Sequence, residues 1–210
     1  MNDTQASEDR PKMLADPVAR AERLKQLNMP HIAPLTQFVK NLREQRGSQA
    51  HIPDFDPWDG GVDAEILFLL EAPGPKAKSS GFVSRNNPDE TAKTLFKLTQ
   101  AAQIPRHQVV LWNVVPWYIG KENGRIRPAV AGDLSSAATA LQTLLPILKQ
   151  VSTIVFMGKK AARVKADIEL WHPGKYRFVE TPHPSPMCLN RSRSRRTLIV
   201  DEFQKIAKVH

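Results

Sequence analysis

Cysteine and long apolar runs are what this sequence most clearly lacks. Cys188 is the single cysteine among 210 residues, which excludes an internal disulfide framework and any zinc or iron–sulfur site built on four cysteines. No hydrophobic run approaches the ~20 residues that a membrane-spanning helix needs, so we expect no membrane partner. The opening residues MNDTQASEDR contain no apolar segment of the kind found in secretory signals. Together with the single thiol, this predicts a reducing, cytoplasmic location.

The length and composition fit one globular domain. Hydrophobic residues make up 41% of the chain and charged residues 24%, proportions that exclude a disordered or fibrous protein. A chain of 210 residues is long enough for one well-packed domain and too short for two ordinary ones. Residues 1–30 are electrically balanced and interrupted by prolines. We therefore expect a polar N-terminal lead-in over residues 1–30 and a single domain over residues 31–210, acting as a monomer.

Positive charge is in excess and is concentrated near one end of the chain. Lysine and arginine number 30 against 21 acidic residues, which gives a net charge of +9 and a pI of about 9.8. A pI this high is typical of nucleic-acid-binding domains, although an ordinary basic surface would also produce it. The distribution favours nucleic acid, because four arginines alternate with serines and no acid interrupts them: Arg191, Arg193, Arg195 and Arg196.

Short apolar runs alternate with helical patterns along the chain. Four segments bounded by turn residues predict strands over residues 64–70, 108–115, 152–157 and 176–181, of which the first two are expected to be buried. The apolar spacing elsewhere predicts helices from Leu35 to Gly47, from about Asp89, over 133–150 with Asp133 as the N-cap, over 159–170 and over 194–207. This alternation predicts the α/β class, as a three-layer α/β/α sandwich around a four-stranded, mainly parallel sheet.

Polar motifs lie at the predicted strand ends. They are LEAPGP (70–75), SGFVSRNNP (80–88), LWNVVPW (111–117) and TPHPSPM (181–187). Each alone has an ordinary structural explanation, such as a tight turn or an asparagine that satisfies the local backbone. The carboxyl ends of parallel strands meet at one edge of a sheet, where α/β folds bind ligands. The four motifs together therefore predict a functional site at that edge.

These motifs resemble those of the uracil-DNA glycosylase superfamily, over roughly residues 64–200. LEAPGP is similar to the first motif, most closely to the GEAPG form of the thermophile iron–sulfur branch, and GFVS (81–84) resembles the segment that supplies a base-stacking phenylalanine. LWNVVPW is similar to the strand that carries a uracil-reading asparagine, and HPSP (183–186) to the loop of the third motif. GKKAA (158–162) resembles a strand-to-helix turn of the same branch. The resemblance implies a glycosylase-like domain over residues 31–210.

The sequence also departs from the pattern of that superfamily. It has no cluster-binding cysteines, so it is not a member of the iron–sulfur branch in the strict sense. Leu70 replaces the first glycine of GEAPG. Ala72 stands where the most studied members have a catalytic aspartate, and Gly74 stands where they have a tyrosine that excludes thymine. The residue that activates water and the means of rejecting thymine are therefore open.

Three residues of these motifs are expected to bind the base. An enzyme that acts on a base in DNA must extrude it, stack it and read its edge. Phe82 offers an aromatic face for stacking, and its polar flanks predict that it is exposed, although it could instead belong to the core. The Asn113 carboxamide can accept a hydrogen bond from uracil N3–H and donate one to O4. Ala72, in the first motif, is expected beside the bound uracil.

Two residues are expected to take part in bond cleavage. His183 would donate a hydrogen bond to uracil O2 as negative charge develops there. Glu71 is the only ionisable side chain of the first motif and would orient or deprotonate the attacking water, with Asp56 and Asp59 as alternatives. The six histidines show no paired metal-ligand spacing and one thiol is no zinc site, so we expect neither a metal nor another cofactor.

The segment after HPSP is predicted to contact DNA. Ser185 belongs to this segment, and Met187 and Leu189 are apolar residues in arginine-rich surroundings. Such residues are suited to fill the gap that an extruded base leaves in the duplex. The alternative is that Met187 and Leu189 anchor the final helix in the core. The four arginines would hold flanking phosphates.

Together, these features predict a DNA base-excision repair enzyme that hydrolyses the N-glycosidic bond of uracil. Its partners would be uracil-containing DNA and, as product, free uracil. No motif places a lysine to form a Schiff base with the sugar, so we expect a monofunctional glycosylase. Two alternatives stay open: the same fold acting on hypoxanthine, xanthine or a mismatched base, or a nucleic-acid-binding module that has lost catalysis. Ala72, at the position of the catalytic aspartate, suggests the second alternative.

Overall fold

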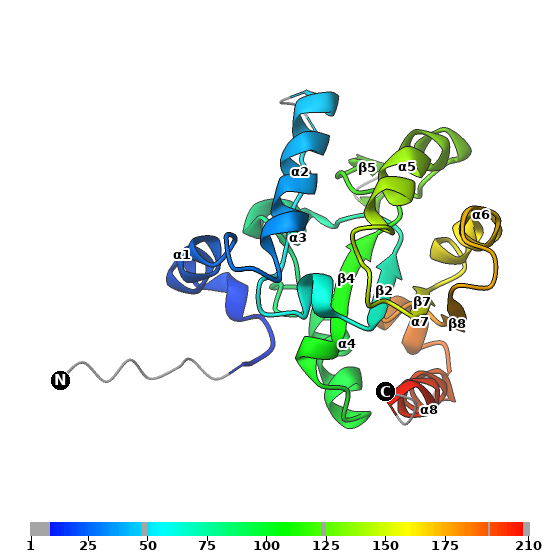
Figure 1. Cartoon of the computed structure of the whole chain (residues 1–210). Coiled ribbons are helices and arrows are strands. Elements are labelled where there is room, and N and C mark those ends of the chain that lie inside the picture. The colour runs from blue at the N-terminus through cyan, green and yellow to red at the C-terminus, as the bar shows by residue number, and fades with distance from the viewer. Residues whose placement is uncertain (1–8, 48–49, 123–124, 193, 208–210) are drawn as a thin grey trace.

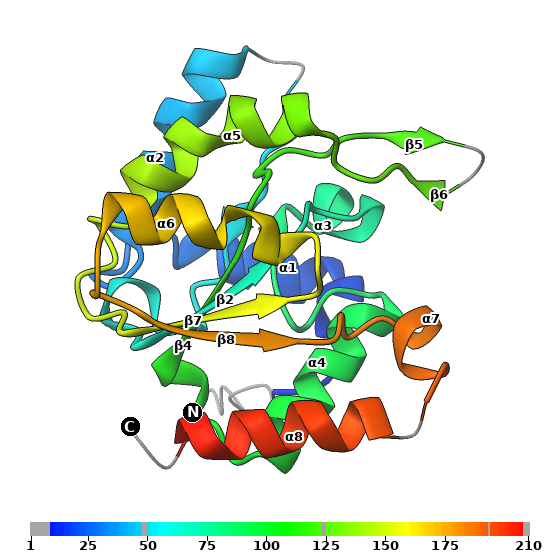
Figure 2. The same ribbon diagram turned by 90° about the vertical axis from the view of Figure 1, so that its right-hand side faces the viewer.

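The structure is a computed structural model that describes residues 9–47, 50–122, 125–192 and 194–207. Strands and helices alternate along the chain, and helices pack on both sides of a central sheet (Figures 1 and 2). Among these residues, no helix has both the length and the apolar character needed to cross a membrane. The predicted α/β class is confirmed.

Four parallel strands form the central sheet, in the order β4-β2-β7-β8. They are β2 (Ile66–Leu70), β4 (Val109–Asn113), β7 (Thr153–Met157) and β8 (Arg177–Thr181). Each lies inside a range that the sequence predicts, so the four-stranded parallel sheet is confirmed. Strands β2, β4 and β7 are buried along almost their whole length, because helices cover both faces, whereas the edge strand β8 is partly exposed.

Helices on both faces complete the three predicted layers (Figure 2). One face is covered by α5 (Ala131–Leu144) and α6 (Lys165–Trp171), and the other by α4 (Glu90–Ala101) and α8 (Ser194–Ala207). The rings of Phe68 in β2 and Phe203 in α8 stack with centroids 4.9 Å apart. Helix α2 (Ala33–Arg46) packs beside α5, and its Phe38 meets Trp112 of β4 edge-on.

The predicted helix boundaries hold in part. Helix α8 has the predicted bounds, and Asp89 caps α4, since its carboxylate accepts a hydrogen bond from the Ala92 N–H at 2.9 Å. Helix α5 begins at Ala131, so Asp133 is its third residue and the predicted N-cap role is wrong. From inside the first turn, the Asp133 carboxylate accepts from the Val130 N–H at 2.9 Å. This bond satisfies an N–H group at the start of the helix, but the carboxylate comes from the third helical residue and not from the N-cap residue.

Several short elements are not predicted by the sequence pattern. They are α1 (Pro17–Lys25), α3 (Pro75–Ser80), α7 (Pro186–Leu189), the parallel pair β1 (Asp54–Phe55) and β3 (Phe82–Val83), the antiparallel pair β5 (Lys121–Glu122) and β6 (Arg125–Ile126), and the 3₁₀ turns η1 (Met13–Ala15), η2 (Gly61–Asp63), η3 (Arg106–Gln108) and η4 (Ala161–Val164). The turn η4 and helix α6 divide the helix predicted over 159–170. Most of these elements contain two to four residues, too few for a periodic pattern.

Part of the predicted N-terminal lead-in is packed against the rest of the fold. Leu14 is buried, and its N–H donates to the carbonyl oxygen of Asn86 at 3.0 Å. Arg23 in α1 is 1% exposed and donates to the carboxylate of Asp56. Residues 13–25 are therefore held by contacts with residues far along the chain.

The order of the strands predicts where a ligand binds. From β2 the chain passes to β4 on one side, and from β4 it crosses back over β2 to reach β7 on the other side. Ligands of open α/β sheets bind at the carboxyl ends of the strands where the direction of connection reverses. Figure 2 shows α3, α7 and the β5–β6 pair at this end of the sheet.

Candidate active site

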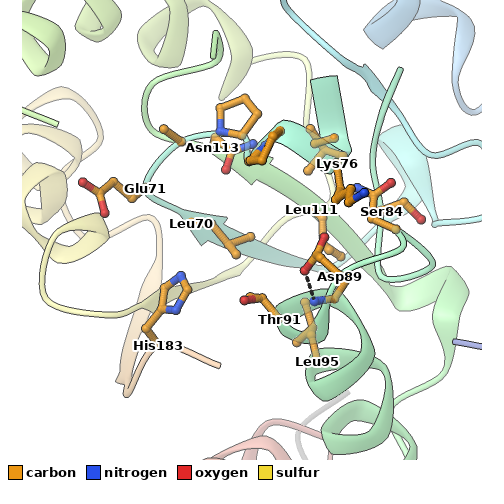
Figure 3. A pocket seen from close by; sticks show the side chains of 18 of the residues that line it. Leu70, Glu71, Lys76, Ser84, Asp89, Thr91, Leu95, Leu111, Asn113 and His183 are labelled. Carbon is orange, nitrogen blue, oxygen red and sulfur yellow. Dashed lines mark hydrogen bonds between the residues drawn. The ribbon is translucent and has the colours of Figure 1, made fainter. Parts of the chain in front are cut away.

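A pocket lies at the carboxyl ends of the sheet strands (Figure 3). Its volume is about 410 Å³, within the ~300–1,000 Å³ typical of small-molecule sites. It is lined by Leu70 at the end of β2 and residues 71–77 after it, several residues from 83 to 95, Leu111 and Asn113 of β4, Arg127, Pro128, Lys160 after β7 and His183 after β8. Residues of all four polar motifs thus meet around one pocket.

Asn113 is the last residue of β4 and pairs in register with Leu70 of β2. Its side chain lines the pocket, although only 3% of the residue is exposed (Figure 3). The carboxamide makes no hydrogen bond to another residue in the described part of the chain. A buried amide normally has partners, so this one is free to bind a ligand through its oxygen and its nitrogen.

His183 follows β8 and faces the pocket from the side of Glu71 (Figure 3). Its Nδ1 accepts a hydrogen bond from the Ser185 N–H at 3.1 Å, which places the proton of the neutral ring on Nε2. Burial lowers the pKa of His183; the nearby Lys160 charge also lowers it, and Glu71 acts in the opposite direction. These effects favour the neutral imidazole, which has one N–H to donate.

A glycine allows the turn after β7 to approach this histidine. Gly158 has a φ of +100°, and a Cβ at this position would lie 3.0 Å from the Cβ of His183. Both the left-handed backbone and the close approach favour glycine here. The N–H of Gly158 also donates to the carbonyl oxygen of Thr181 at 2.8 Å, which ties the turn to the end of β8.

Glu71 is held on one side of the pocket by two donors. Its Oε1 accepts from the Ala129 N–H at 2.7 Å and lies 3.3 Å from the Nζ of Lys160. Its Oε2 has no hydrogen-bond donor among the residues that the structure describes. One oxygen of the carboxylate is thus fixed, and the other is available. Ala72 and Gly74, next along the same loop, also line the pocket.

The predicted exposure of Phe82 is wrong. The residue is fully buried in β3 and is absent from the described residues that line the pocket, where its neighbours Val83 and Ser84 are found. Its polar flanks do not open it to solvent, because they bond to one another: Asn87 donates to the Phe82 carbonyl oxygen at 2.9 Å and accepts from Ser80 at 2.6 Å. Stacking on a base stays a prediction and would require this ring to become accessible.

The segment after HPSP divides into a buried and an exposed part. Leu189 is 1% exposed and belongs to the core, which favours the anchoring alternative; its insertion into DNA stays a prediction and would require the side chain to become accessible. Met187 is 63% exposed, so its side chain is accessible for the predicted insertion into DNA. Ser185 caps α7 by accepting from the Cys188 N–H.

The arginine cluster is only partly free. Arg191 and Arg196 are exposed. Arg195 is half-buried and uses its Nη1 to donate to the Cys188 carbonyl oxygen at 2.8 Å. Its first role is therefore to fix the segment that carries Met187. Arg193 lies outside the described residues.

Asp56 and Asp59, the alternative water activators, belong to a buried ionic cluster. Asp56 accepts from Arg23, from Ser84 and, at 2.6 Å, from Arg106. Asp59 lies 2.9 Å from the Nε of Arg106. Neither aspartate is found among the described residues that line the pocket. Their proposed part in activating water is therefore not supported.

The two aspartates of this cluster have different electrostatic settings. Burial acts to raise the pKa of Asp56, but the guanidinium groups of Arg106 and Arg23 outweigh it and hold the pKa below its ordinary value. Burial raises the pKa of Asp59 to about 6, against the opposing charges of Arg106 and Arg85. Asp56 is thus the firmly ionised centre of the cluster.

Lys160 lines the pocket, although the sequence pattern predicts no role for it. It stands in the GKKAA turn, whose likeness to a family turn was the only available signal. Ser84, Thr91 and Arg127 also line the pocket. Ser84 connects the pocket to the buried cluster through its bond to Asp56, and Arg127 is paired with Asp133 at 2.6 Å.

Comparisons with known proteins identify the family. The sequence model of the Uracil DNA glycosylase superfamily matches residues 57–207, which is most of the chain, and no curated protein matches the sequence. The crystal structure of wild-type SMUG2 from Pedobacter heparinus is similar in fold, with 11% identity, a TM-score of 0.55 and coverage of 90% of this chain and 97% of that one. An NMR structure of a candidate uracil DNA glycosylase from Methanosarcina acetivorans has 17% identity, a TM-score of 0.46 and coverage of 68% and 90%. The chain belongs to the uracil DNA glycosylase superfamily.

Proposed function

We propose that this chain hydrolyses the N-glycosidic bond of uracil in DNA and releases free uracil, leaving an abasic site. The observation that carries the proposal is the meeting of Asn113, His183 and Glu71, from three strand ends, around one pocket. Membership of the superfamily supports a glycosylase that acts on DNA. The choice of uracil rests on the chemistry of these three side chains.

Asn113 is suited to read the edge of uracil. Its oxygen can accept a hydrogen bond from N3–H while its nitrogen donates to O4. Cytosine presents the reverse pattern, with an amino donor at C4 and an acceptor at N3. A carboxamide fixed for uracil would therefore leave polar groups unpaired against cytosine, at a cost of ~1–3 kcal/mol for each group.

His183 is suited to stabilise the departing base. Cleavage of the C1′–N1 bond moves negative charge onto the uracil ring, including O2. The Nε2–H of a neutral imidazole can donate to that oxygen, and the bond from the Ser185 N–H to Nδ1 keeps the proton on Nε2. A donor of this kind typically contributes about 10²–10³ in rate.

Glu71 is suited to position the attacking water. Its Oε1 is occupied by the Ala129 N–H and by Lys160, while its Oε2 can accept from a water molecule at the pocket. A carboxylate in this position acts as general base or as an orienting group. Ala72 stands at the position of the family's catalytic aspartate, and its methyl side chain cannot take the role of that aspartate.

Met187, Arg191 and Arg196 are proposed to contact the DNA around the extruded nucleotide. Met187 is an exposed apolar side chain that can fill the gap in the base stack. The exposed guanidinium groups of Arg191 and Arg196 can bind flanking phosphates. Ser185 and Arg195 support this segment through their bonds to Cys188.

The test is incubation with a uracil-containing oligonucleotide, followed by alkali to cut abasic sites. We expect cleavage at the uracil position, and no cleavage by the Asn113→Ala/His183→Ala double variant, which controls for a contaminating glycosylase. Tight binding of DNA without cleavage by the parental chain would contradict the proposal and favour a binding module. Trapping with borohydride during the reaction should give no covalent adduct, because we expect no lyase step.

A second candidate is excision of a deaminated purine or a mismatched base. The observation that favours it is Gly74, which lines the pocket without a side chain where well-studied members carry a bulky residue. Oligonucleotides with hypoxanthine, xanthine or thymine opposite guanine, tested beside uracil, separate the two candidates. Cleavage of these substrates alone would replace uracil as the proposed substrate.

A further inference from the structure

Lys160 lies in the pocket between the two groups that the proposed reaction uses. It follows β7, whereas Glu71 follows β2 and His183 follows β8, so three neighbouring strands bring these side chains together. Its Nζ is 3.3 Å from Oε1 of Glu71, and its side chain is 42% exposed. The adjacent Lys159 is exposed and lies outside the described residues that line the pocket.

The contact with Lys160 determines which carboxylate oxygen of Glu71 is free. Lys160 and the Ala129 N–H both bind Oε1, from different segments of the chain. A carboxylate that is held through one oxygen has a restricted orientation, and its second oxygen points to a defined place. Without the ammonium group, a single backbone hydrogen bond would hold Glu71.

Lys160 also offsets the charge of Glu71 at His183. The charged groups that act on the imidazole are Glu71, from the loop after β2, and Lys160, from the turn after β7. Glu71 raises the pKa of His183, whereas burial and Lys160 lower it. If Lys160 were removed, the carboxylate would act on the imidazole without opposition and would favour its protonation.

We propose that Lys160 is a positioning residue of this site, whose ammonium group fixes the Glu71 carboxylate and balances its negative charge beside His183. The inference rests on the proposed function for its catalytic consequence. A neutral His183 accepts from the Ser185 N–H and presents Nε2–H to the base. Protonation of Nδ1 would abolish the bond to Ser185 and release the ring from this orientation.

The first test measures His183 without any substrate. The protonation of its imidazole is followed by NMR titration, with the His183→Gln variant used to assign its signal among the six histidines. We expect the titration midpoint of His183 to move to higher pH in Lys160→Met, and to return toward the parental value in Lys160→Arg. Lys159→Met, which removes the same charge one residue away, should leave the midpoint unchanged.

The second test measures single-turnover excision of uracil across pH. Lys160→Met should lower the rate by up to about 100-fold, as expected when a reacting group loses its orientation, and the acidic limb of its profile should move to higher pH. Lys160→Arg should restore most of the rate. The affinity for uracil-containing DNA and its salt dependence should change little.

The outcomes separate this role from a phosphate contact. An unchanged His183 titration in Lys160→Met, together with weaker DNA binding and a flatter salt dependence, would overturn the proposal and make Lys160 a phosphate ligand. An unchanged titration with an unchanged rate would overturn it as well. If the parental chain excises no uracil, the proposed function fails, and the titration of His183 still decides whether Lys160 controls its charge.

Discussion

Two carboxylates of this protein, Asp56 in the buried cluster and Glu71 in the pocket, differ in how completely their oxygens are paired. Both oxygens of Asp56 are occupied, by Arg23 and the Trp58 N–H on one side and by Arg106 and Ser84 on the other. In the pocket, Oε2 of Glu71 has no donor within the described part of the chain. The fully paired Asp56 is a structural group, whereas the second oxygen of Glu71 is able to bind a ligand.

The buried cluster and the pocket are connected, which gives the cluster a functional consequence. Ser84 lines the pocket and donates to Asp56, and the Asn86 N–H donates to the hydroxyl oxygen of Ser84 at 2.9 Å. The carboxamide of Asn86 in turn accepts from Arg23 and Arg106. The cluster therefore supports one wall of the pocket. Variants of the buried cluster and of the pocket residues test whether effects on stability and on reaction rate can be separated.

The largest expected effect is a loss of stability when the buried cluster is broken. Arg106→Met would remove the arginine that Asp56 and Asp59 share and leave each with one remaining arginine, Arg23 for Asp56 and Arg85 for Asp59; breaking a buried ion pair in this way typically costs about 3–5 kcal/mol. Urea denaturation measures the free energy of unfolding. Lys205→Met, which breaks an exposed pair with Glu202, is the control and should cost no more than ~1 kcal/mol. Equal stabilities of the two variants would contradict the structural role of the buried cluster.

Removal of His183 should affect the rate and spare the fold. Its proposed partner charge develops only in the transition state, so His183→Ala should lower the single-turnover rate by about 10²–10³ with little change in affinity for uracil-containing DNA. The free energy of unfolding should stay close to the parental value. A collapse of affinity, with an unchanged rate at saturating enzyme, would show instead that His183 only holds the DNA.

Replacement of Asn113 should change which base is excised. In Asn113→Asp, a carboxylate oxygen replaces the amide donor, so it repels uracil O4 and can accept from the cytosine amino group. Uracil excision should fall by an amount corresponding to ~1–3 kcal/mol for each polar group left unpaired, and the ratio of cytosine to uracil excision should rise. Asn113→Ala should lose uracil excision without that rise. Parental rates in both variants would remove Asn113 from the proposed base-reading role.

The smallest expected effect concerns the exposed arginines. Arg191→Ala/Arg196→Ala should weaken binding to DNA of any sequence and flatten the slope of log K against log salt by ~0.7–0.9 for each lost phosphate contact. The matched control is Lys149→Ala/Lys205→Ala, which removes two exposed positive charges near the opposite end of the strands. An equal change in slope in both variants would indicate a general effect of charge rather than a contact surface.

Local sequence patterns predict the sheet and part of the site. Apolar runs between turn residues locate β2, β4 and β7, because burial on both faces requires continuous hydrophobic side chains, and the alternation of strands with helices locates the edge strand β8. The meeting of Asn113, His183 and Glu71 follows from parallel strands, whose carboxyl ends share one edge. These features depend on the order of elements and on residue type, both of which a sequence displays.

Features that depend on distant contacts could not be predicted in the same way. Asp56 is paired with residues 33, 28 and 50 positions away, and no local pattern connects them. The polar neighbours of Phe82 predict that it is exposed, but the sequence does not reveal that these neighbours hydrogen-bond to one another. Lys159 and Lys160 are identical in type, and only the contact with Glu71 distinguishes them.

The partly exposed edge strand β8 also bears on how the protein avoids aggregation. An exposed sheet edge offers unpaired backbone groups to which a strand of another molecule can add. Along β8, Arg177 and Glu180 are exposed and carry charge, and Glu180 is paired with Lys165 of α6 at 2.9 Å. Charged side chains at such an edge oppose the addition of a further strand. The five residues of β8 thus form one edge of the sheet and also oppose self-association through that edge.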